Sequence, residues 1–437
     1  MYGWSLLAFN INILLNFKIK SRLLEVELNM DLLPWAVMAI LSTLTGILLV
    51  LFLVSSPLRM SFFLFLFLIL LGGAIAWAVI FFTSPQLFLV IIFGLVFFIG
   101  GFLGSTLGFL NQNENRDLPM LTRQPGENGL GHTAVIYFTH GEPPGYDPFP
   151  WLETIREFDH DNVPFIPFPF RPFFFHGIRK EYLQAGGSSH NQIHGYIFRA
   201  LQASFSETEK AKYRFFLAFL DSNPRPDEMV IKAINEGADR IILLPIFITI
   251  SSHTLAGQEM VAALDPEKYG VIVKMAEPLW NSSILREHFI KKAEVARGNT
   301  DRDQIGILLV GHGQPKAWDG IYPTQTEQEN LYRDGIKQTF VSQGYKDENI
   351  FSAWMSFKNP SIEEGLHALT RNNISKILVF SASISAASLH SEIDVPNAIK
   401  KAKISRSIQV INMGAFGDPL DPLVINAIRE RILSCAV

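Results

Sequence analysis

Two histidines in this sequence each follow an apolar run of strand length, and each is followed directly by a glycine. His140 comes after residues 134–139, and His312 comes after residues 305–311. Continuous apolar runs are typical of buried parallel strands, and open α/β sheets bind ligands at the carboxyl ends of their strands. An imidazole at that edge is titratable near neutral pH, because its unperturbed pKa is about 6.5. The two units predict two similar lobes that face one cleft.

The elements that would position these histidines alternate between strand and helix from about residue 133 onward. Apolar runs predict strands at 134–139, 241–248, 271–275, 305–311, 350–355 and 376–383. Apolar residues at helical spacing predict helices at 190–206, 227–236, 282–296, 324–343, 361–372 and 420–433. Strands separated by helices form parallel sheets that are covered on both faces. We therefore predict an α/β fold with two similar Rossmann-like lobes and a cleft between them.

A second repeat gives the boundaries of the lobes. The apolar runs that contain Ile241 and Ile377 each follow a helix preceded by the pattern Pro-x-x-(Asp/Glu)-Glu. Their spacing is 136 (377 − 241), whereas the two histidines are 172 apart (312 − 140), so the first lobe holds about 36 extra residues. We place these in 145–190. The predicted lobes are residues 133–297 and 298–437.

Three apolar segments precede the lobes, at residues 32–56, 60–83 and 86–110. None contains Asp, Glu, Lys or Arg, and each exceeds the roughly 20 residues needed to span a bilayer. Gly72-Gly73 and Gly100-Gly101-x-x-Gly104 favour close helix packing. We predict a three-helix membrane anchor over 32–110, in contact with lipid, with 111–132 as a linker; three buried helices of a soluble core are the alternative.

Basic residues near the spans bear on orientation. Three lie on the side of the lobes: Arg59, Arg116 and Arg123. By the positive-inside rule they place the soluble domain in the cytoplasm. Three others, in the N-terminal segment 1–31, argue for the opposite: Lys18, Lys20 and Arg22. A start at Met30, which would leave residues 1–29 outside the mature chain, removes the conflict.

The overall charge and cysteine content exclude several classes. The net charge is −4 and the sequence pI is near 6.3, with no recurring basic patch, so we expect no nucleic-acid partner. Cys435 is the single cysteine. It cannot form a disulfide, a cysteine-held iron–sulfur cluster or a zinc ribbon within this chain.

Blocks of residues between 134 and 400 resemble ferrochelatase and the wider class II tetrapyrrole chelatases. In chain order they are Gly141-Glu-Pro143, Tyr182–Ser189, Leu243–Ser251, Val310–Pro315, Tyr322–Glu329 and Leu389–Asp394. The resemblance implies two chelatase-type lobes and the insertion of a divalent metal ion into a tetrapyrrole. Fe²⁺ or Co²⁺ would be the substrate metal, and we expect no permanently bound cofactor. Whether the chain is a monomer or a homodimer is left open at this point.

Some positions depart from the ferrochelatase pattern. Ser388 stands where ferrochelatases have an acidic residue, and Phe219-Leu220 replaces an Arg-Tyr pair. His390, in the frame His390-x-x-x-Asp394, resembles the second metal-facing histidine of sirohydrochlorin and cobalt chelatases. His140 stands where ferrochelatases usually have leucine, whereas short and tandem chelatases have a histidine in both halves. The chain therefore combines features of both subfamilies.

Metal insertion requires the removal of water from the ion and of two protons from pyrrole nitrogens. A neutral imidazole can bind the ion or accept a proton, and a carboxylate offers a hard ligand on the way in. The catalytic candidates are His312, His390 and Glu392. The candidate metal contacts are His312, His390, Glu392, Asp394 and His140. Each candidate also has a purely structural alternative. His312 could be a hydrogen-bonded histidine at a strand end, and the acids at 390–394 could offset the dipole of a helix N-terminus. His140 could belong to a vestigial turn that is kept for packing.

Other histidines are weaker candidates. His253 follows Ser251-Ser252 and could face the same cleft. Those in the inserted segment are expected to lie at the surface or to make hydrogen bonds: His160, His176, His190 and His194.

The segment 163–175 is rich in both proline and phenylalanine, and it occupies the place of the hydrophobic lip of ferrochelatases. Prolines should prevent a regular helix there. Phe170 could grip a flat macrocycle, and Arg171 could bind a propionate; packing on the core, or insertion of the rings into the bilayer, are alternatives. The remaining substrate-binding candidates are Tyr146, Phe247, Ser251 and Tyr322.

The leading hypothesis is a membrane-anchored, ferrochelatase-like enzyme that inserts Fe²⁺ into a porphyrin in haem biosynthesis. A sirohydrochlorin cobalt or iron chelatase is the enzyme alternative, favoured by the three histidines. A non-catalytic tetrapyrrole carrier is another. A transporter is disfavoured, because no charged cluster lies inside the spans.

Overall fold

The computed structural model describes residues 32–114, 116–163 and 166–435. The predicted N-terminal segment 1–31 and a start at Met30 lie outside the described residues. The chain divides into two compact units. Unit 1 holds the residues up to Asn113 together with Phe168–Phe174, and unit 2 holds Glu114–Pro167 and Phe175–Val437.

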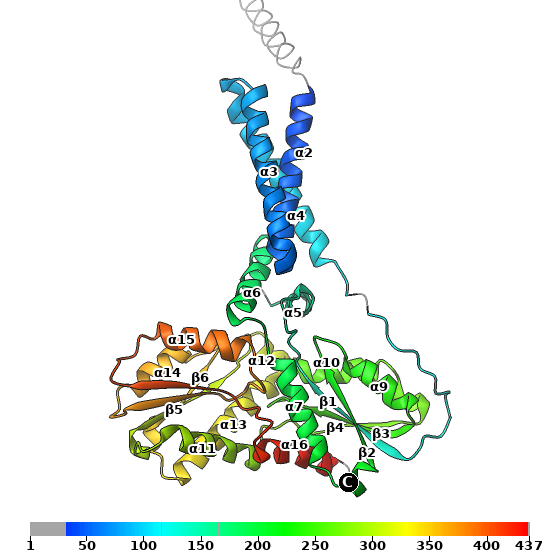
Figure 1. Ribbon diagram of the computed structural model, residues 1–437, viewed down its shortest axis with the longest axis vertical. Helices are drawn as coiled ribbons and strands as arrows, with labels where there is room; N and C mark the ends of the chain where they lie inside the picture. Colours follow the sequence, from blue (N-terminus) through cyan, green and yellow to red (C-terminus); the bar gives the residue numbers. More distant parts are fainter. Residues whose placement is uncertain (1–31, 115, 164–165, 436–437) are drawn as a thin grey trace, which may run out of the picture. The chain divides into compact units, whose positions relative to one another are not determined.

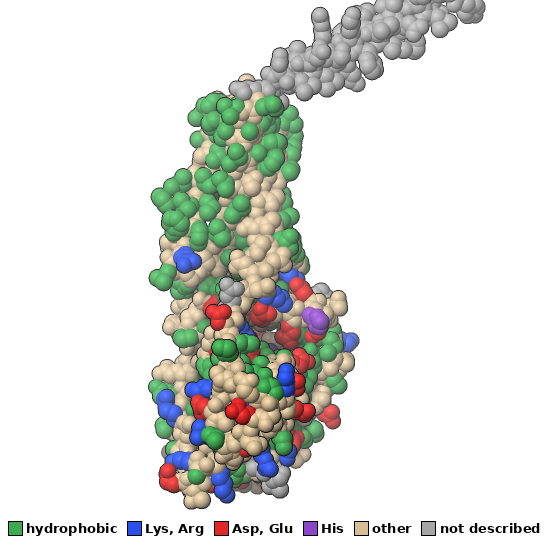
Figure 2. Space-filling model, turned by 90° about the vertical axis from the view of Figure 1, so that its right-hand side faces the viewer, with side chains coloured by type: hydrophobic (Ala, Val, Ile, Leu, Met, Phe, Trp, Pro, Cys, Tyr) green, Lys and Arg blue, Asp and Glu red, His purple; other side chains and the backbone are tan. Residues whose placement is uncertain are grey.

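Unit 1 contains the three apolar segments as helices α2 (Leu32–Val54), α3 (Pro57–Phe81) and α4 (Ser84–Leu110). All three are long and apolar enough to cross a membrane, as predicted. In Figure 2 hydrophobic side chains cover this unit, whereas charged side chains gather on unit 2. Phe173, from the segment that belongs to this unit, lies with its ring centroid 6.1 Å from that of Phe102 on α4.

The packing of α2 on α4 depends on glycines that allow the backbones to approach closely. A Cβ atom on Gly101 would overlap the carbonyl oxygen of Thr43, and one on Gly46 would overlap that of Phe98. The neighbouring Gly100 faces open space, with nothing within 4 Å of such an atom. The predicted close approach therefore applies to Gly101, whereas Gly72, Gly73, Gly100 and Gly104 have no such contact.

This difference makes a matched pair of substitutions informative. We expect Gly101→Ala to destabilise the helix pair by about 1–3 kcal/mol, because the added methyl has no room. Gly100→Ala should leave stability unchanged or slightly raised. Thermal unfolding of the full chain in detergent, followed by tryptophan fluorescence, measures both, and equal melting temperatures for the two variants would contradict the packing.

Unit 2 contains two four-stranded parallel sheets with the same strand order. The first has the order β2-β1-β3-β4 and is built from β1 (His132–Thr139), β2 (Tyr213–Phe219), β3 (Ala238–Pro245) and β4 (Ile272–Met275). The second has the order β6-β5-β7-β8 and is built from β5 (Ile305–Gly311), β6 (Ile350–Trp354), β7 (Lys376–Ser381) and β8 (Gln409–Ala415). The shared order confirms the α/β class and the predicted repeat (Figure 1).

Both faces of the first sheet are covered. Val135 and Tyr137 of β1 point into one hydrophobic cluster, while Ala134, Ile136 and Phe138 point into another. The helices that cover the first sheet include α7 (His190–Ala203), α9 (Pro226–Asn235) and α10 (Ser252–Ala262). Those that pack on the second sheet include α13 (Pro323–Ser342), α14 (Ile362–Leu369) and α15 (Val395–Lys401). This alternation along a parallel strand explains why the predicted strands read as continuous apolar runs.

Strands β2 and β8 were absent from the sequence prediction. Each is at the edge of its sheet, and most of its residues are only partly buried. In β8, Asn412 and Gly414 interrupt the apolar run, so this strand does not have the continuous apolar pattern used for the prediction. In β2 the residues after Arg214 are all apolar, so the signal for this strand was present and was overlooked.

The extra residues of the first lobe form α5 (Pro148–His160) and α6 (Arg171–Ala185) within the predicted segment 145–190. The expectation that prolines prevent a helix through residue 175 was wrong, because Phe173–Phe175 lie in α6. Pro172 is in the first turn of that helix, where a missing N–H costs nothing. Only Phe168–Phe170 form a separate 3₁₀ turn.

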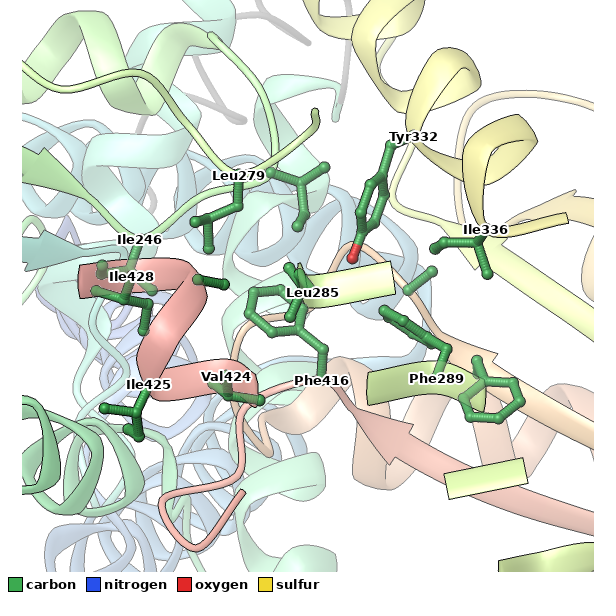
Figure 3. Close-up of a cluster of buried hydrophobic side chains, with 14 of the residues drawn as sticks. Ile246, Leu279, Leu285, Phe289, Tyr332, Ile336, Phe416, Val424, Ile425 and Ile428 are labelled. Carbon is green, nitrogen blue, oxygen red and sulfur yellow. The ribbon is translucent and has the colours of Figure 1, made fainter. Parts of the chain in front are cut away.

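The two lobes exchange their last helices. Helix α11 (Ser283–Arg297), which the predicted boundary assigns to the first lobe, packs against α13 and β7 of the second. Helix α16 (Pro422–Cys435) returns to pack against β3 and α7 of the first. One hydrophobic core runs through both lobes as a result (Figure 3), with Ile246 and Ile428 towards the first sheet and Phe289 and Ile336 towards the second.

Candidate functional site

The candidate residues lie just beyond the carboxyl ends of equivalent strands in the two sheets. His140 follows β1 and Asp221 follows β2 in the first lobe. His312 follows β5, and the turn with His390 comes after β7, in the second lobe. Parallel strands bring these ends to one edge of each sheet, as the sequence predicted.

The backbone around His312 is held by a carboxylate. Glu329 on α13 accepts hydrogen bonds from the backbone N–H groups of His312 (2.8 Å) and Gly313 (3.1 Å). The imidazole Nδ1 lies 2.7 Å from the carbonyl oxygen of Gly313. Since that oxygen can only accept, Nδ1 carries the proton and Nε2 of the neutral ring keeps its lone pair.

Burial is the main cause that lowers the pKa of His312, and the charge of His390 lowers it further. Glu329 acts in the opposite direction on this pKa without reversing the shift. His312 is therefore a neutral base or ligand near pH 7.

His390 lies in a single π-helical turn, His390–Asp394, which continues into α15. Such turns occur frequently at functional sites. Its Nδ1 is 2.6 Å from Asp394 Oδ2, and its ring centroid is 5.4 Å from that of His312, with the two rings nearly perpendicular. Burial tends to lower the pKa of His390, but Asp394 and Glu142 together raise it.

His140 repeats this arrangement in the first lobe. Its Nδ1 is 2.8 Å from Asp221 Oδ2 and 3.1 Å from the Gly141 carbonyl oxygen. Burial opposes the charged ring, yet the ion pair with Asp221 raises the pKa of His140 to about 9. The charge of His140 contributes to the lowered pKa of His312, so the two lobes form one electrostatically connected site.

His253 is also part of this site. Its ring centroid is 4.6 Å from that of His140, and its ring stacks on Phe247 at 6.0 Å. Burial, with the charge of His140, lowers the pKa of His253 to about 3. It is a neutral ring beside a charged one.

In His140, His312 and His390 alike, Nδ1 is bound to a fixed acceptor, which leaves Nε2 for other chemistry. This arrangement is typical of metal-binding histidines, whose second nitrogen is held by a carboxylate or carbonyl group. Among residues 32–114, 116–163 and 166–435, no three His, Cys, Asp or Glu side chains are arranged to hold an ion as they stand.

Two further carboxylates act on the same histidines. Glu181 on α6 interacts with the charges of His390 and Asp394, and Glu157 on α5 with those of Asp221 and His140. Burial is the main cause that raises the pKa of both acids. They are therefore suited to hold a proton near the site.

Of the two remaining catalytic and metal candidates, Asp394 lies at the site and Glu392 does not contact the site histidines. Asp394 is at the site as the partner of His390. Glu392 has an exposed side chain, and it accepts a hydrogen bond from Ser391 Oγ at 3.3 Å in its own helix. A direct role for Glu392 stays a prediction.

The substrate-binding candidates are dispersed. Phe247 stacks on His253, and Ser251 is buried as the N-cap of α10. Tyr146 is buried with its ring 6.1 Å from that of Tyr182, and the hydroxyl of Tyr322 donates to Asp161 at 3.4 Å. Phe170 and Arg171 belong to unit 1.

The weaker histidine candidates in α7 are core residues. His194 has its Nδ1 2.7 Å from the hydroxyl of Tyr137 and its Nε2 3.1 Å from Ser385 Oγ of the other lobe. Burial lowers the pKa of His190 to about 4 and that of His194 further. Both make hydrogen bonds, as expected, but they are buried and not at the surface.

Sequence reasoning missed Asp221, Glu329 and Glu142 as site residues. Asp221 lies just after an edge strand that was not predicted, although an acid directly after Phe219-Leu220 is a signal that could have identified it. Glu329 was noted within a family block without a role. Glu142 was noted within the block Gly141-Glu-Pro143, also without a role.

Comparison with known families finds a match for the second lobe. Residues 306–435 match the family model described as CbiX. This part of the second lobe is therefore similar to the CbiX family, in agreement with the chelatase resemblance predicted from the sequence. A comparison with curated proteins found no match.

Solved structures with a similar arrangement include two of SirB and one of CbiX. SirB from Bacillus subtilis with Fe³⁺ has 12% identity and a TM-score of 0.47, over 70% of this chain and 96% of that one. The sirohydrochlorin chelatase SirB from Bacillus subtilis subspecies spizizenii, in complex with cobalt, has 13% identity and a TM-score of 0.44, over 70% and 95%. CbiX, the terminal enzyme for siroheme biosynthesis in denitrifying bacteria, has 14% identity and a TM-score of 0.39, over 69% and 98%.

The ion pair of His140 gives a pH-dependent prediction. Because the pKa of His140 is raised to about 9, the pair stabilises the folded protein fully below about pH 6.5 and loses this effect as the pH rises through 9. Asp221→Asn should lower this pKa and flatten the dependence of stability on pH between 7 and 10. Titration of ¹³C-labelled histidine by NMR, in wild type and variant, measures the shift; an unchanged His140 pKa in the variant would rule out the ion pair.

Proposed function

We propose that the protein is a membrane-anchored chelatase that inserts a divalent metal ion into a tetrapyrrole. The observation that carries the proposal is the pair His312 and His390, whose ring centroids are 5.4 Å apart. In each ring Nδ1 is bound to an acceptor and Nε2 is left for a ligand. The pair lies at the strand ends of a lobe that matches the CbiX family.

In this reaction the ion enters the ring as two protons leave its pyrrole nitrogens. Neutral His312 can accept one proton or bind the ion through Nε2. His390 can bind the ion once its own proton is released, with Asp394 holding the ring in place. Glu157 and Glu181, whose pKa values are raised, can take protons onward to solvent.

A sirohydrochlorin-type substrate fits the site best. Three histidines with bound Nδ1 atoms, one of them from the first lobe, are the features that the sequence associates with sirohydrochlorin and cobalt chelatases. A macrocycle with many carboxylates would also be attracted by the cationic rings of His140 and His390. Co²⁺ or Fe²⁺ would then be the substrate metal, since both accept imidazole ligands.

Insertion of Fe²⁺ into a porphyrin, in haem biosynthesis, is the second candidate. Phe173 belongs to the membrane unit and contacts Phe102 there, in keeping with a substrate that enters from lipid. A carrier without catalysis is the remaining possibility.

Insertion assays with the full chain in detergent test the proposal. We expect product from sirohydrochlorin with Co²⁺ or Fe²⁺, and His312→Ala should reduce the rate by about 100-fold or more, because base and ligand are lost together. The control is His367→Ala, an exposed histidine on α14 of the same lobe. Product from protoporphyrin alone would favour the second candidate, and binding without turnover would favour the carrier. Full activity of His312→Ala would refute the role of His312 in metal insertion.

We also propose that unit 2 lies in the cytoplasm. Three spans place the α2–α3 turn, with Arg59 beside it, on the same side as the residues after α4, where Arg116 and Arg123 occur.

Cysteine labelling measures this orientation. In a Cys435→Ser background, Leu420→Cys at an exposed position should react with a membrane-impermeant maleimide only after spheroplasts are permeabilised. Ser84→Cys, at the first residue of α4 after the α3–α4 turn, should react in intact spheroplasts. The reverse pattern would place unit 2 outside.

A further inference from the structure

Glu142 is a buried carboxylate for which the proposed chemistry has no role so far. It follows His140-Gly141 after β1, and 8% of the residue is exposed. Gly141 has φ of +90°, and a Cβ atom there would lie 2.6 Å from Phe219 Cβ. The turn therefore requires glycine, and it directs the next residue inward from the strand end.

The carboxylate of Glu142, in the first lobe, binds a backbone group of the second lobe. Its two oxygens accept hydrogen bonds from the backbone N–H of Leu389, at 3.3 and 3.1 Å. Leu389 directly precedes the π-helical turn that carries His390. Backbone N–H groups at the start of a helix lack intrahelical partners, and a carboxylate satisfies them well.

The first lobe orients this carboxylate through the sequence Gly186-Gly187-Ser188 after α6. Ser188 Oγ donates a hydrogen bond to Glu142 Oε2, and the Ser188 backbone N–H donates to the carbonyl oxygen of Pro144 (3.0 Å). Gly187, at φ of +112°, lies so close to Pro144 that a Cβ atom would be 2.5 Å from its carbonyl oxygen. Asn191 Oδ1 accepts from the Glu142 backbone N–H at 2.8 Å. Glu142 is therefore fixed both at its backbone N–H and at its carboxylate.

Ser388, noted in the sequence as standing where ferrochelatases have an acidic residue, has only a hydroxyl, which caps its own turn. Ser391 Oγ accepts from the Ser388 backbone N–H at 3.0 Å, and the Ser391 backbone N–H is 3.5 Å from Ser388 Oγ. The carboxylate next to this turn is instead that of Glu142, contributed by the other lobe.

We propose that Glu142 is a positioning residue: held by Ser188, its carboxylate binds the N-terminus of the His390 turn and fixes that histidine beside His312 across the two lobes. The proposal deepens the proposed chelatase function and rests on it. Loss of partners that orient metal-binding groups typically reduces metal affinity or activity by about 10- to 100-fold.

The test compares three variants of the full chain in detergent. Glu142→Ala removes the acceptor, whereas Glu142→Gln keeps an oxygen that can accept from Leu389. Glu364→Ala is the matched control, because Glu364 also binds a helix N-terminus of the second lobe, at the Ser361 N–H (2.7 Å), but within its own helix. The readouts are hydrogen exchange of the peptide around residues 386–395, the affinity for Co²⁺, and the kcat and KM of insertion.

We expect Glu142→Ala to speed exchange around Leu389 and to reduce kcat and Co²⁺ affinity by about 10- to 100-fold, with Glu142→Gln retaining most of both. Glu364→Ala should speed exchange only around residue 361. Unchanged exchange in Glu142→Ala, or equal losses in the Ala and Gln variants, would overturn the proposal. If the wild type inserts no metal into any macrocycle, the proposed function fails, while exchange and Co²⁺ affinity still decide the role of Glu142.

Discussion

The site depends on one constraint, the fixing of imidazole Nδ1 atoms by acceptors that cannot move. In His312 the acceptor is the next carbonyl oxygen, and in His140 and His390 it is a carboxylate. Each acceptor selects the ring orientation and leaves Nε2 for an ion or a proton. Since His140 and His312 follow central parallel strands, the sheets place these rings without help from flexible loops.

The exchange of helices between the lobes explains how such a constraint can extend from one lobe to the other. If each lobe had its own complete core, the distance between their strand ends would depend on a thin interface. Here α11 and α16 each complete the core of the other lobe, and Asp421 before α16 binds His288 (2.8 Å) and Lys291 (3.1 Å) of α11. A core shared in this way resists hinge motion, because close-packed interiors deform little.

The sequence predicted the central strands and the two histidine turns because these carry a local signal. A buried parallel strand must be apolar along its whole length, so β1 and β5 could be recognised from their residues alone. The edge strand β8 lacks that signal, whereas the apolar run of β2 was overlooked, and with it the partner Asp221. The Phe-rich segment was misjudged for a related reason: Pro172 disfavours a helix interior, and only the position where α6 begins makes it acceptable.

The role of Glu142 could not be predicted, because it comes from a difference between the two lobes. In the second lobe the carboxylate of Glu329 accepts the N–H groups of the histidine turn. At the equivalent place in the first lobe, the neutral amide of Asn191 accepts the N–H of Glu142. The carboxylate of the first lobe instead comes from the histidine turn itself and reaches the other lobe, where it accepts from Leu389 N–H. This use of Glu142 can be seen only when the two repeats are folded against each other.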